Sequence, residues 1–100
     1  MAHADDDLVA AATRGDVATI RRLIAAGAPV DARDASGRTA LLAATHADQV
    51  EAARVLIEAG ADVNAKDDIE DSPFLYAAAE GRVDILKLTL AHGADLKSTN

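Results

Sequence analysis

The chain has no cysteine and no tryptophan, and it has one tyrosine, one phenylalanine and two prolines among 100 residues. Without cysteine it can form no disulfide, and it has no thiolate to act as a metal ligand or a nucleophile. No apolar stretch approaches the roughly 20 residues that a membrane-spanning helix needs. The sequence therefore excludes a disulfide scaffold, and we expect no membrane partner.

Basic residues are also few, because ten lysines and arginines face seventeen acidic residues and the formal net charge is −7. A nucleic-acid surface needs a positive footprint, so no nucleic-acid partner is expected. The N-terminus lacks the basic and apolar segment of a targeting peptide, which favours a cytoplasmic location. Ala2-His3-Ala4 is similar to the end of a signal-peptide cleavage site, however, so a periplasmic or secreted location stays open as an alternative.

Groupings typical of catalysis are missing as well. His3, His46 and His92 are scattered, no serine has a histidine at a suggestive spacing, and there is no glycine-rich phosphate loop. His46, Asp48 and Glu51 are metal-ligand residue types close together, but they span a predicted turn and are better interpreted as solvated surface. We expect no enzyme and no cofactor, and keep a small metal-binding or hydrolytic protein as an alternative.

A 33-residue repeat is the main feature of the sequence. The dipeptide Gly-Ala begins at positions 27, 60 and 93, and apolar residues recur at the same offset. Such a period marks a stacked array in which each copy buries its apolar face against the next. The positions in register are Val17, Val50 and Val83; Leu8, Leu41 and Phe74; Ile24, Ile57 and Leu90; and Val30, Val63 and Leu96.

Each unit is predicted to contain two helices and a long loop. Thr39 and its counterpart Ser72 are placed to cap a short first helix, and Gly81 is suited to end one in a left-handed turn. A second helix should begin near Val50 and stop at Gly60. The polar segment from 60 to 72 predicts an extended, turn-forming connection.

The segments 37–44 (GRTALLAA) and 72–78 (SPFLYAA) resemble the opening of an ankyrin repeat, and 56–65 (LIEAGADVNA) and 90–95 (LAHGAD) resemble its close. The resemblance implies an all-α, ankyrin-like helical solenoid that forms one domain over residues 1–100. Its repeats would cover approximately 5–33, 34–66 and 67–97, with 98–100 starting a truncated next unit.

Departures from the family pattern mark positions of interest. The family usually has histidine where this chain has Leu42 and Leu75, so apolar packing must replace the hydrogen bonds of that histidine. Glu70 is the counterpart of Gly37, and a left-handed turn at a non-glycine residue costs about 1 kcal/mol. We therefore expect the loop at 67–71 to have its own shape. Asp48 stands where the other repeats have Gly15 and Gly81. This is a milder change than Glu70, because Asp tolerates left-handed backbone better than most residues.

In ankyrin-like folds, loop tips and the facing surface of the first helices form the usual groove for protein partners. Ile69 lies among carboxylates and is a candidate apolar anchor for a partner with a basic surface, although loop solvation explains these charges equally well. Tyr76 either faces the groove or packs between repeats. The expected partner-binding residues are Arg14, Ser36, Arg38, His46, Asp68, Ile69, Asp71, Tyr76 and Glu80.

The two ends of the array differ. Asp5-Asp6-Asp7 is expected to stabilise the first helix through its N-terminal dipole. The last helix pair is expected to have one side uncovered, with Phe74, Ile85, Leu86 and Leu90 among its apolar residues. The resemblance implies a non-enzymatic protein–protein interaction module, and the alternative is a structural module that self-associates through this last repeat.

Overall fold

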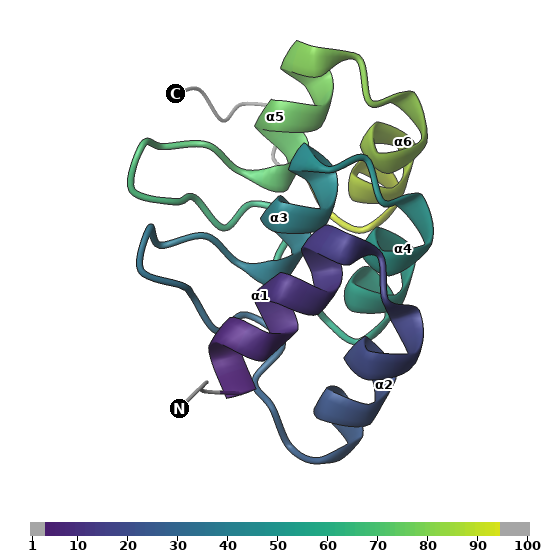
Figure 1. Cartoon of the computed structure of the whole chain (residues 1–100). Coiled ribbons are helices and arrows are strands. Elements are labelled where there is room, and N and C mark those ends of the chain that lie inside the picture. Colours follow the sequence, from purple (N-terminus) through teal and green to yellow (C-terminus); the bar gives the residue numbers. More distant parts are fainter. Residues whose placement is uncertain (1–3, 95–100) are drawn as a thin grey trace.

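The helices in the described part of the chain are arranged as three helix-turn-helix pairs, which long loops connect. The structure is a computed structural model that describes residues 4–94, with side chains from residue 7 onward. The helices are α1 (Ala4–Arg14), α2 (Val17–Ala25), α3 (Ala40–His46), α4 (Val50–Glu58), α5 (Pro73–Glu80) and α6 (Val83–Ala91). The first helices of the pairs form one layer and the second helices form another (Figure 1). The predicted all-α ankyrin-like solenoid is thus confirmed.

The predicted caps begin the first helices of the second and third pairs. The Thr39 hydroxyl accepts a hydrogen bond from the amide of Leu42, and the Ser72 hydroxyl accepts one from the amide of Leu75. Both caps are almost fully buried. Pro73 occupies the first helical position of α5, where its missing N–H leaves no hydrogen bond unmade.

The turns inside the helix pairs share one backbone conformation. Gly15, Asp48 and Gly81 lie at equivalent positions, with φ of 72°, 55° and 70°. Asp48 adopts the left-handed conformation that was expected of it. Gln49 follows the turn at Asp48, and Arg82 follows the turn at Gly81. The side chain of each contacts the preceding helix pair. Gln49 Nε2 lies 3.2 Å from the Thr13 carbonyl, and one repeat later Arg82 Nη2 lies 3.4 Å from the His46 carbonyl.

The core follows the register of the repeat. Leu8 and Leu41 are fully buried, and the alanines beside them let neighbouring helices approach closely. In the last pair, Phe74 and Ile85 are also buried, and Ile85 belongs to the core that is shared with the preceding helices. Of the apolar residues named for this pair, Leu90 is exposed, at 46%, and Val83 on the same helix is exposed as well.

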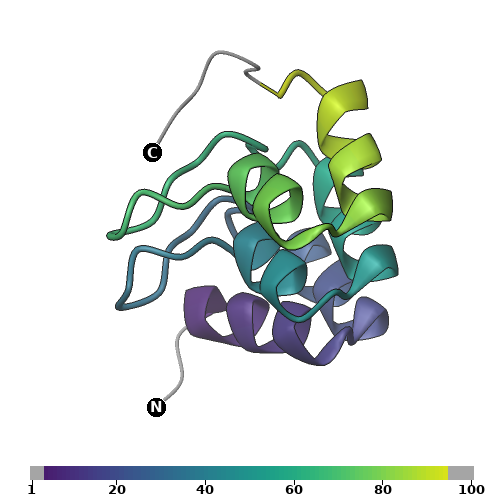
Figure 2. The ribbon, with the colours of Figure 1, turned by 90° about the horizontal axis from the view of Figure 1, so that it is seen from above.

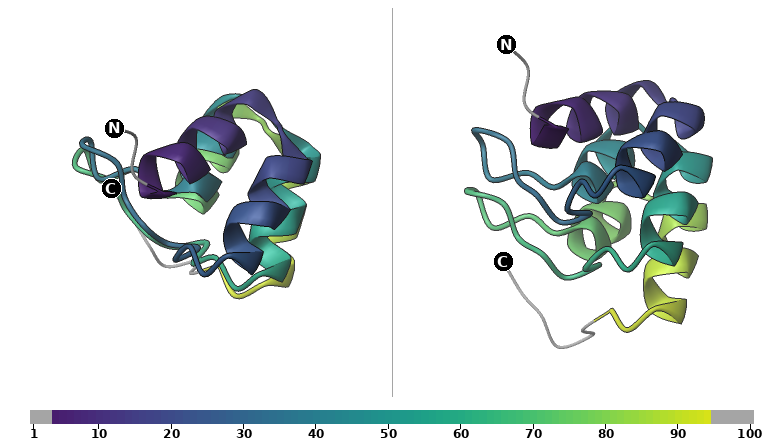
Figure 3. Two further views of the ribbon diagram at one scale, coloured as in Figure 1. Left: turned by 60° about the horizontal axis from the view of Figure 1, so that its bottom comes forward. Right: turned by 90° about the horizontal axis from the view of Figure 1, so that it is seen from below.

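Two long loops connect the pairs and lie side by side at one edge of the stack (Figure 2). Viewed down the stack, they trace the same path (Figure 3, left). Gly37 and Glu70 both have left-handed backbone, with φ of 75° and 66°. The expectation that residues 67–71 have their own shape is therefore wrong: Glu70 is held in the conformation that glycine adopts in the other loop. An isolated β-bridge joins Arg33 to Thr39.

No helix in the described part of the chain combines the length and the apolar character needed to cross a bilayer.

Candidate functional site

The shape of each loop tip depends on an aspartate carboxylate. Asp67 is 7% exposed, and its Oδ1 accepts hydrogen bonds from the amides of Ile69 (3.0 Å) and Asp71 (2.9 Å). Asp34 makes the same two bonds in the preceding loop. These bonds satisfy the turn's amides and hold Glu70 left-handed. Asp67 therefore has a structural role in this loop, and sequence reasoning assigned it no such role.

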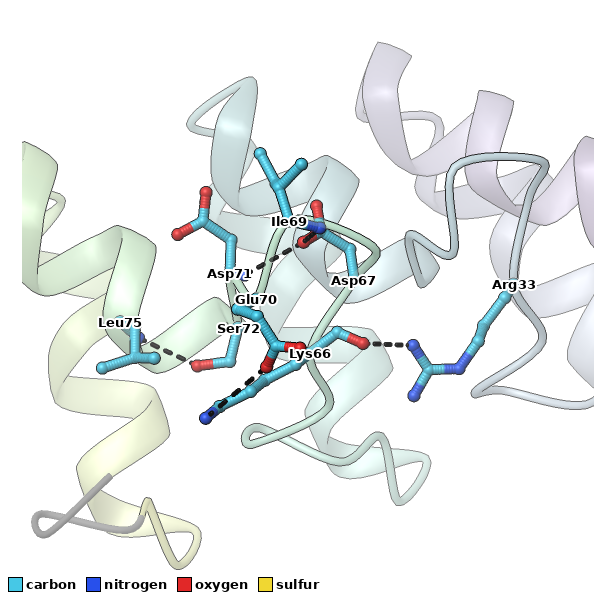
Figure 4. Close-up of polar contacts among 8 residues, drawn as sticks. All are labelled: Arg33, Lys66, Asp67, Ile69, Glu70, Asp71, Ser72 and Leu75. Atoms are coloured by element: carbon cyan, nitrogen blue, oxygen red, sulfur yellow. Dashed lines mark hydrogen bonds and ion pairs between the residues drawn. The ribbon is translucent and has the colours of Figure 1, made fainter. Parts of the chain in front are cut away.

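The two loop tips also contact one another. The Asp68 amide donates to the Ser36 carbonyl at 3.1 Å, and the Asp68 carboxylate lies so close to Gly37 that a side chain at Gly37 would clash with it. One guanidinium nitrogen of Arg33 donates to the carbonyls of both Gly37 and Lys66, and the contact to Lys66 is drawn in Figure 4. The tips therefore form one continuous edge across two repeats.

Ile69 is the most exposed large apolar side chain among the described residues, at 72%. It lies at the loop tip and points to the same side of the loop as the Asp71 carboxylate (Figure 4). Lys66 and Glu70 extend to the opposite side, where their charged groups are 4.0 Å apart. The loop thus presents an apolar group and a carboxylate together, while its lysine and glutamate pair elsewhere.

An aromatic contact joins the second and third helix pairs beside this edge. The rings of His46, at the end of α3, and Tyr76, on α5, are stacked with centroids 3.7 Å apart and planes inclined by 15°. Both side chains are half-buried. Tyr76 therefore packs between repeats, as one of the two interpretations of the sequence held, and it keeps part of its surface exposed.

Several charges surround the imidazole of His46. Burial lowers the pKa of His46, and the guanidinium of Arg38 lowers this pKa further. The carboxylates of Asp71 and Asp67 act in the opposite direction, and Arg82 again lowers the pKa. His46 Nε2 is buried and has no hydrogen-bond partner among the described residues. The fold thus favours the neutral imidazole.

Sequence reasoning missed Arg82, which contacts the His46 carbonyl. The sequence shows that Arg82 lies 33 residues after Gln49, at the same position of the repeat. Gln49 makes the equivalent contact to its own preceding helix pair. Two of the expected residues lie apart from the others. Arg14 is exposed and forms an ion pair with Asp16 at 3.6 Å, and Glu80 is exposed at the end of α5. Within residues 4–94, neither side chain makes a hydrogen bond, an ion pair or a ring contact with His46 or Tyr76.

A concavity lies on the layer formed by the second helices. An open pocket of about 360 Å³ between α2 and α4 is lined by Arg21, Ile24, Ala25, Val55, Glu58 and Ala59. None of these residues belongs to the loop edge. Among the described residues, no three His, Asp or Glu side chains are grouped so that they could hold a metal ion, and His46, Asp48 and Glu51 do not converge.

The family model for ankyrin repeats (3 copies) matches residues 8–100. The chain belongs to the ankyrin repeat family. Its fold is similar to the crystal structure of an ankyrin repeat domain from Acinetobacter baumannii AYE, with a TM-score of 0.90 and 56% sequence identity. That match covers 93% of this chain and 47% of the other, so this chain spans about half the length of the A. baumannii domain. No protein of curated function gives a significant match.

Ankyrin repeats are generally protein–protein interaction modules, and the fold is typically a non-enzymatic binding module. The side chains gathered at the loop edge suit that role. They supply an exposed apolar group, an aromatic stack and charges of both signs on a backbone that hydrogen bonds hold in place.

Proposed function

We propose that this chain is a non-enzymatic ankyrin module that binds a partner protein through its loop tips and the adjoining face of α3 and α5. The observation that carries the proposal is Ile69. A side chain of this size that is 72% exposed, on a loop tip held by two hydrogen bonds to a buried carboxylate, loses little conformational freedom when a partner covers it. A preorganised apolar group of this kind is typical of a binding hot spot.

Charge adds a preference for the partner's surface. Asp68 and Asp71 lie next to Ile69, and the whole chain carries a net charge of −7. A partner with basic residues around the segment that covers Ile69 gains electrostatic attraction both on approach and in the complex. Replacing Asp68 and Asp71 together by lysine should therefore weaken capture of the partner while the helical circular dichroism signal stays unchanged.

Capture from a cell lysate by the immobilised chain, quantified by mass spectrometry, tests the role of Ile69. We expect Ile69→Ser to reduce capture of the specific partner at least tenfold, which is about 1.4 kcal/mol. Val83→Ser is the matched control, because Val83 is another exposed apolar residue and lies on α6, away from the loop edge. Equal capture by wild type and Ile69→Ser, or stronger loss with Val83→Ser, would contradict the proposal.

A second candidate function is self-association through α6. Val83 and Leu90 are two helical turns apart on this helix, so they lie on one face, and they are 55% and 46% exposed. Two copies could bury these faces against each other. Light scattering across a hundredfold range of protein concentration decides the matter, since a constant monomer mass at the highest concentration would exclude this role.

A further inference from the structure

Two unpaired charges of opposite sign occupy equivalent positions in neighbouring repeats. Arg38 and Asp71 are one repeat apart, and each immediately precedes the cap of a first helix. Both side chains are half-buried. Neither the Arg38 guanidinium nor the Asp71 carboxylate makes a hydrogen bond or an ion pair with any described residue, and Arg38 Nε is buried without a partner. Neither charge is therefore paired within the described residues, and each side chain keeps part of its surface exposed.

These two charges lie beside the apolar and aromatic groups of the edge. Arg38 and Asp71 are each close enough to the His46 imidazole to influence its pKa, and His46 stacks on Tyr76. Asp71 also points to the same side of its loop as Ile69 (Figure 4). The five residues Arg38, His46, Ile69, Asp71 and Tyr76 thus form a strip across the second and third repeats, which we name the charge-ordered strip.

Building on the proposed function, we propose that the charge-ordered strip binds an extended segment of the partner that carries a carboxylate and a cation about three residues apart, with an apolar side chain next to the cation. The carboxylate pairs with Arg38 of the second repeat. The cation pairs with Asp71 of the third repeat, and the apolar side chain covers Ile69.

The spacing follows from the stack. Packed helices lie about 8–10 Å apart, so equivalent positions in neighbouring repeats are separated by about that distance. An extended chain advances about 3.3 Å per residue, and about three residues therefore span the two charges. Complementary charges fix the register and direction of such a segment, because the reversed segment would place like charges together.

The charge order can be tested with a phage-displayed library of random dodecapeptides, selected on the immobilised full chain. We expect enriched peptides to carry Asp or Glu and Lys or Arg at one fixed separation of two to four residues. A synthetic peptide with the most enriched sequence then serves as the ligand for titration calorimetry. Arg38→Glu and Asp71→Lys should each weaken its binding at least tenfold, whereas Arg22→Glu, an exposed charge on α2, should leave affinity within twofold.

A charge exchange separates loss of contact from loss of fold. The double variant Arg38→Asp/Asp71→Arg should bind the peptide whose two charges have been exchanged at least tenfold more tightly than the original peptide. Enriched peptides without a charge pair, or the same affinity of the double variant for both peptides, would overturn the charge order and leave the proposed function standing. If no peptide is enriched at all, the charge-order proposal fails, because the edge then recognises no extended segment, whereas the proposed function is decided separately by capture with Ile69→Ser.

Discussion

At the scale of single residues, two positions without glycine within residues 4–94 have left-handed backbone. Asp48 and Glu70 have φ of 55° and 66°. Asp tolerates this conformation better than most residues, and Glu is not among the residue types that do. Glu70 is thus the more strained of the two, and the surrounding turn bonds hold it in place.

Glu70→Gly should therefore stabilise the protein by about 0.5–1 kcal/mol, because relief of the strain exceeds the extra entropy of glycine in the unfolded chain. The exposed contact to Lys66 that is lost is worth only a few tenths of a kcal/mol. Urea unfolding followed by circular dichroism measures the change. Asp48→Gly should gain less, and Glu70→Gln should gain nothing, since it keeps the strain. A gain from Glu70→Gln equal to that from Glu70→Gly would show that charge, not strain, matters at this site.

His46 gives the fold a dependence on pH. Its pKa is lowered in the folded state by burial and by Arg38, while in the unfolded chain it lies near the ordinary value of 6.5. The unfolded state therefore binds more protons than the folded state in the range below about pH 7. The stability contributed by neutral His46 is present above pH 6.5 and is lost as the pH falls through the folded pKa.

We predict that the melting temperature falls between about pH 7.5 and about pH 5, and that His46→Phe has a flatter profile, because phenylalanine keeps the ring stack and does not titrate. The slope due to this one proton cannot exceed about 1.4 kcal/mol per pH unit. Tyr76 offers an independent signal, since it is the only tyrosine in a chain without tryptophan. Its fluorescence should change with pH in the wild type and not in His46→Phe. Parallel melting profiles for the two proteins would refute the assignment to His46.

At the scale of elements, the two long loops are copies of one turn that an aspartate organises. The carboxylates of Asp34 and Asp67 each accept hydrogen bonds from two backbone amides of their loop tip. The backbone amide of each aspartate also donates across the turn, and the Asp67 amide lies 2.8 Å from the Asp71 carbonyl. The surface that we propose for binding therefore depends on the Asp67 side chain, which is almost fully buried.

Asp67→Ala should release the tip without unfolding the helices. Loss of the two hydrogen bonds to its buried carboxylate is expected to cost about 1–3 kcal/mol, and amide hydrogen exchange at Ile69 and Asp71 should become at least tenfold faster. Asp34→Ala is the matched control, because it should speed exchange in the other loop only. Unchanged exchange at Ile69 in Asp67→Ala would show that the backbone alone holds this tip.

The elements were largely predictable from the sequence, and the contacts between repeats were not. The period of the repeat and the caps Thr39 and Ser72 placed the helices, because caps and apolar spacing act within one unit. The stack of His46 on Tyr76 was not foreseen, since these two residues do not occupy equivalent positions in their repeats and so lie outside the register. The prediction for the loop at 67–71 was wrong because it considered only the backbone strain at Glu70. It left out the two hydrogen bonds to the Asp67 carboxylate, which offset that strain.

At the scale of the whole molecule, the proposed binding edge exists only because the repeats stack. The loop tips touch through the Asp68 amide and the Ser36 carbonyl, and the aromatic stack joins α3 to α5. In a stacked array each repeat contacts only its neighbours, so a surface built across two repeats is lost when their interface opens. Partner binding should therefore stabilise the interface between the second and third helix pairs more than the rest of the array.

The most direct test of this account is a nuclear magnetic resonance titration of the ¹⁵N-labelled chain with the peptide selected from the library. The account predicts that the largest amide shift changes fall at residues 34–38, 46, 67–71 and 76, with little change in α2. Shift changes concentrated at the pocket between α2 and α4, or along α6 near Leu90, would contradict it and place the binding surface elsewhere on the molecule.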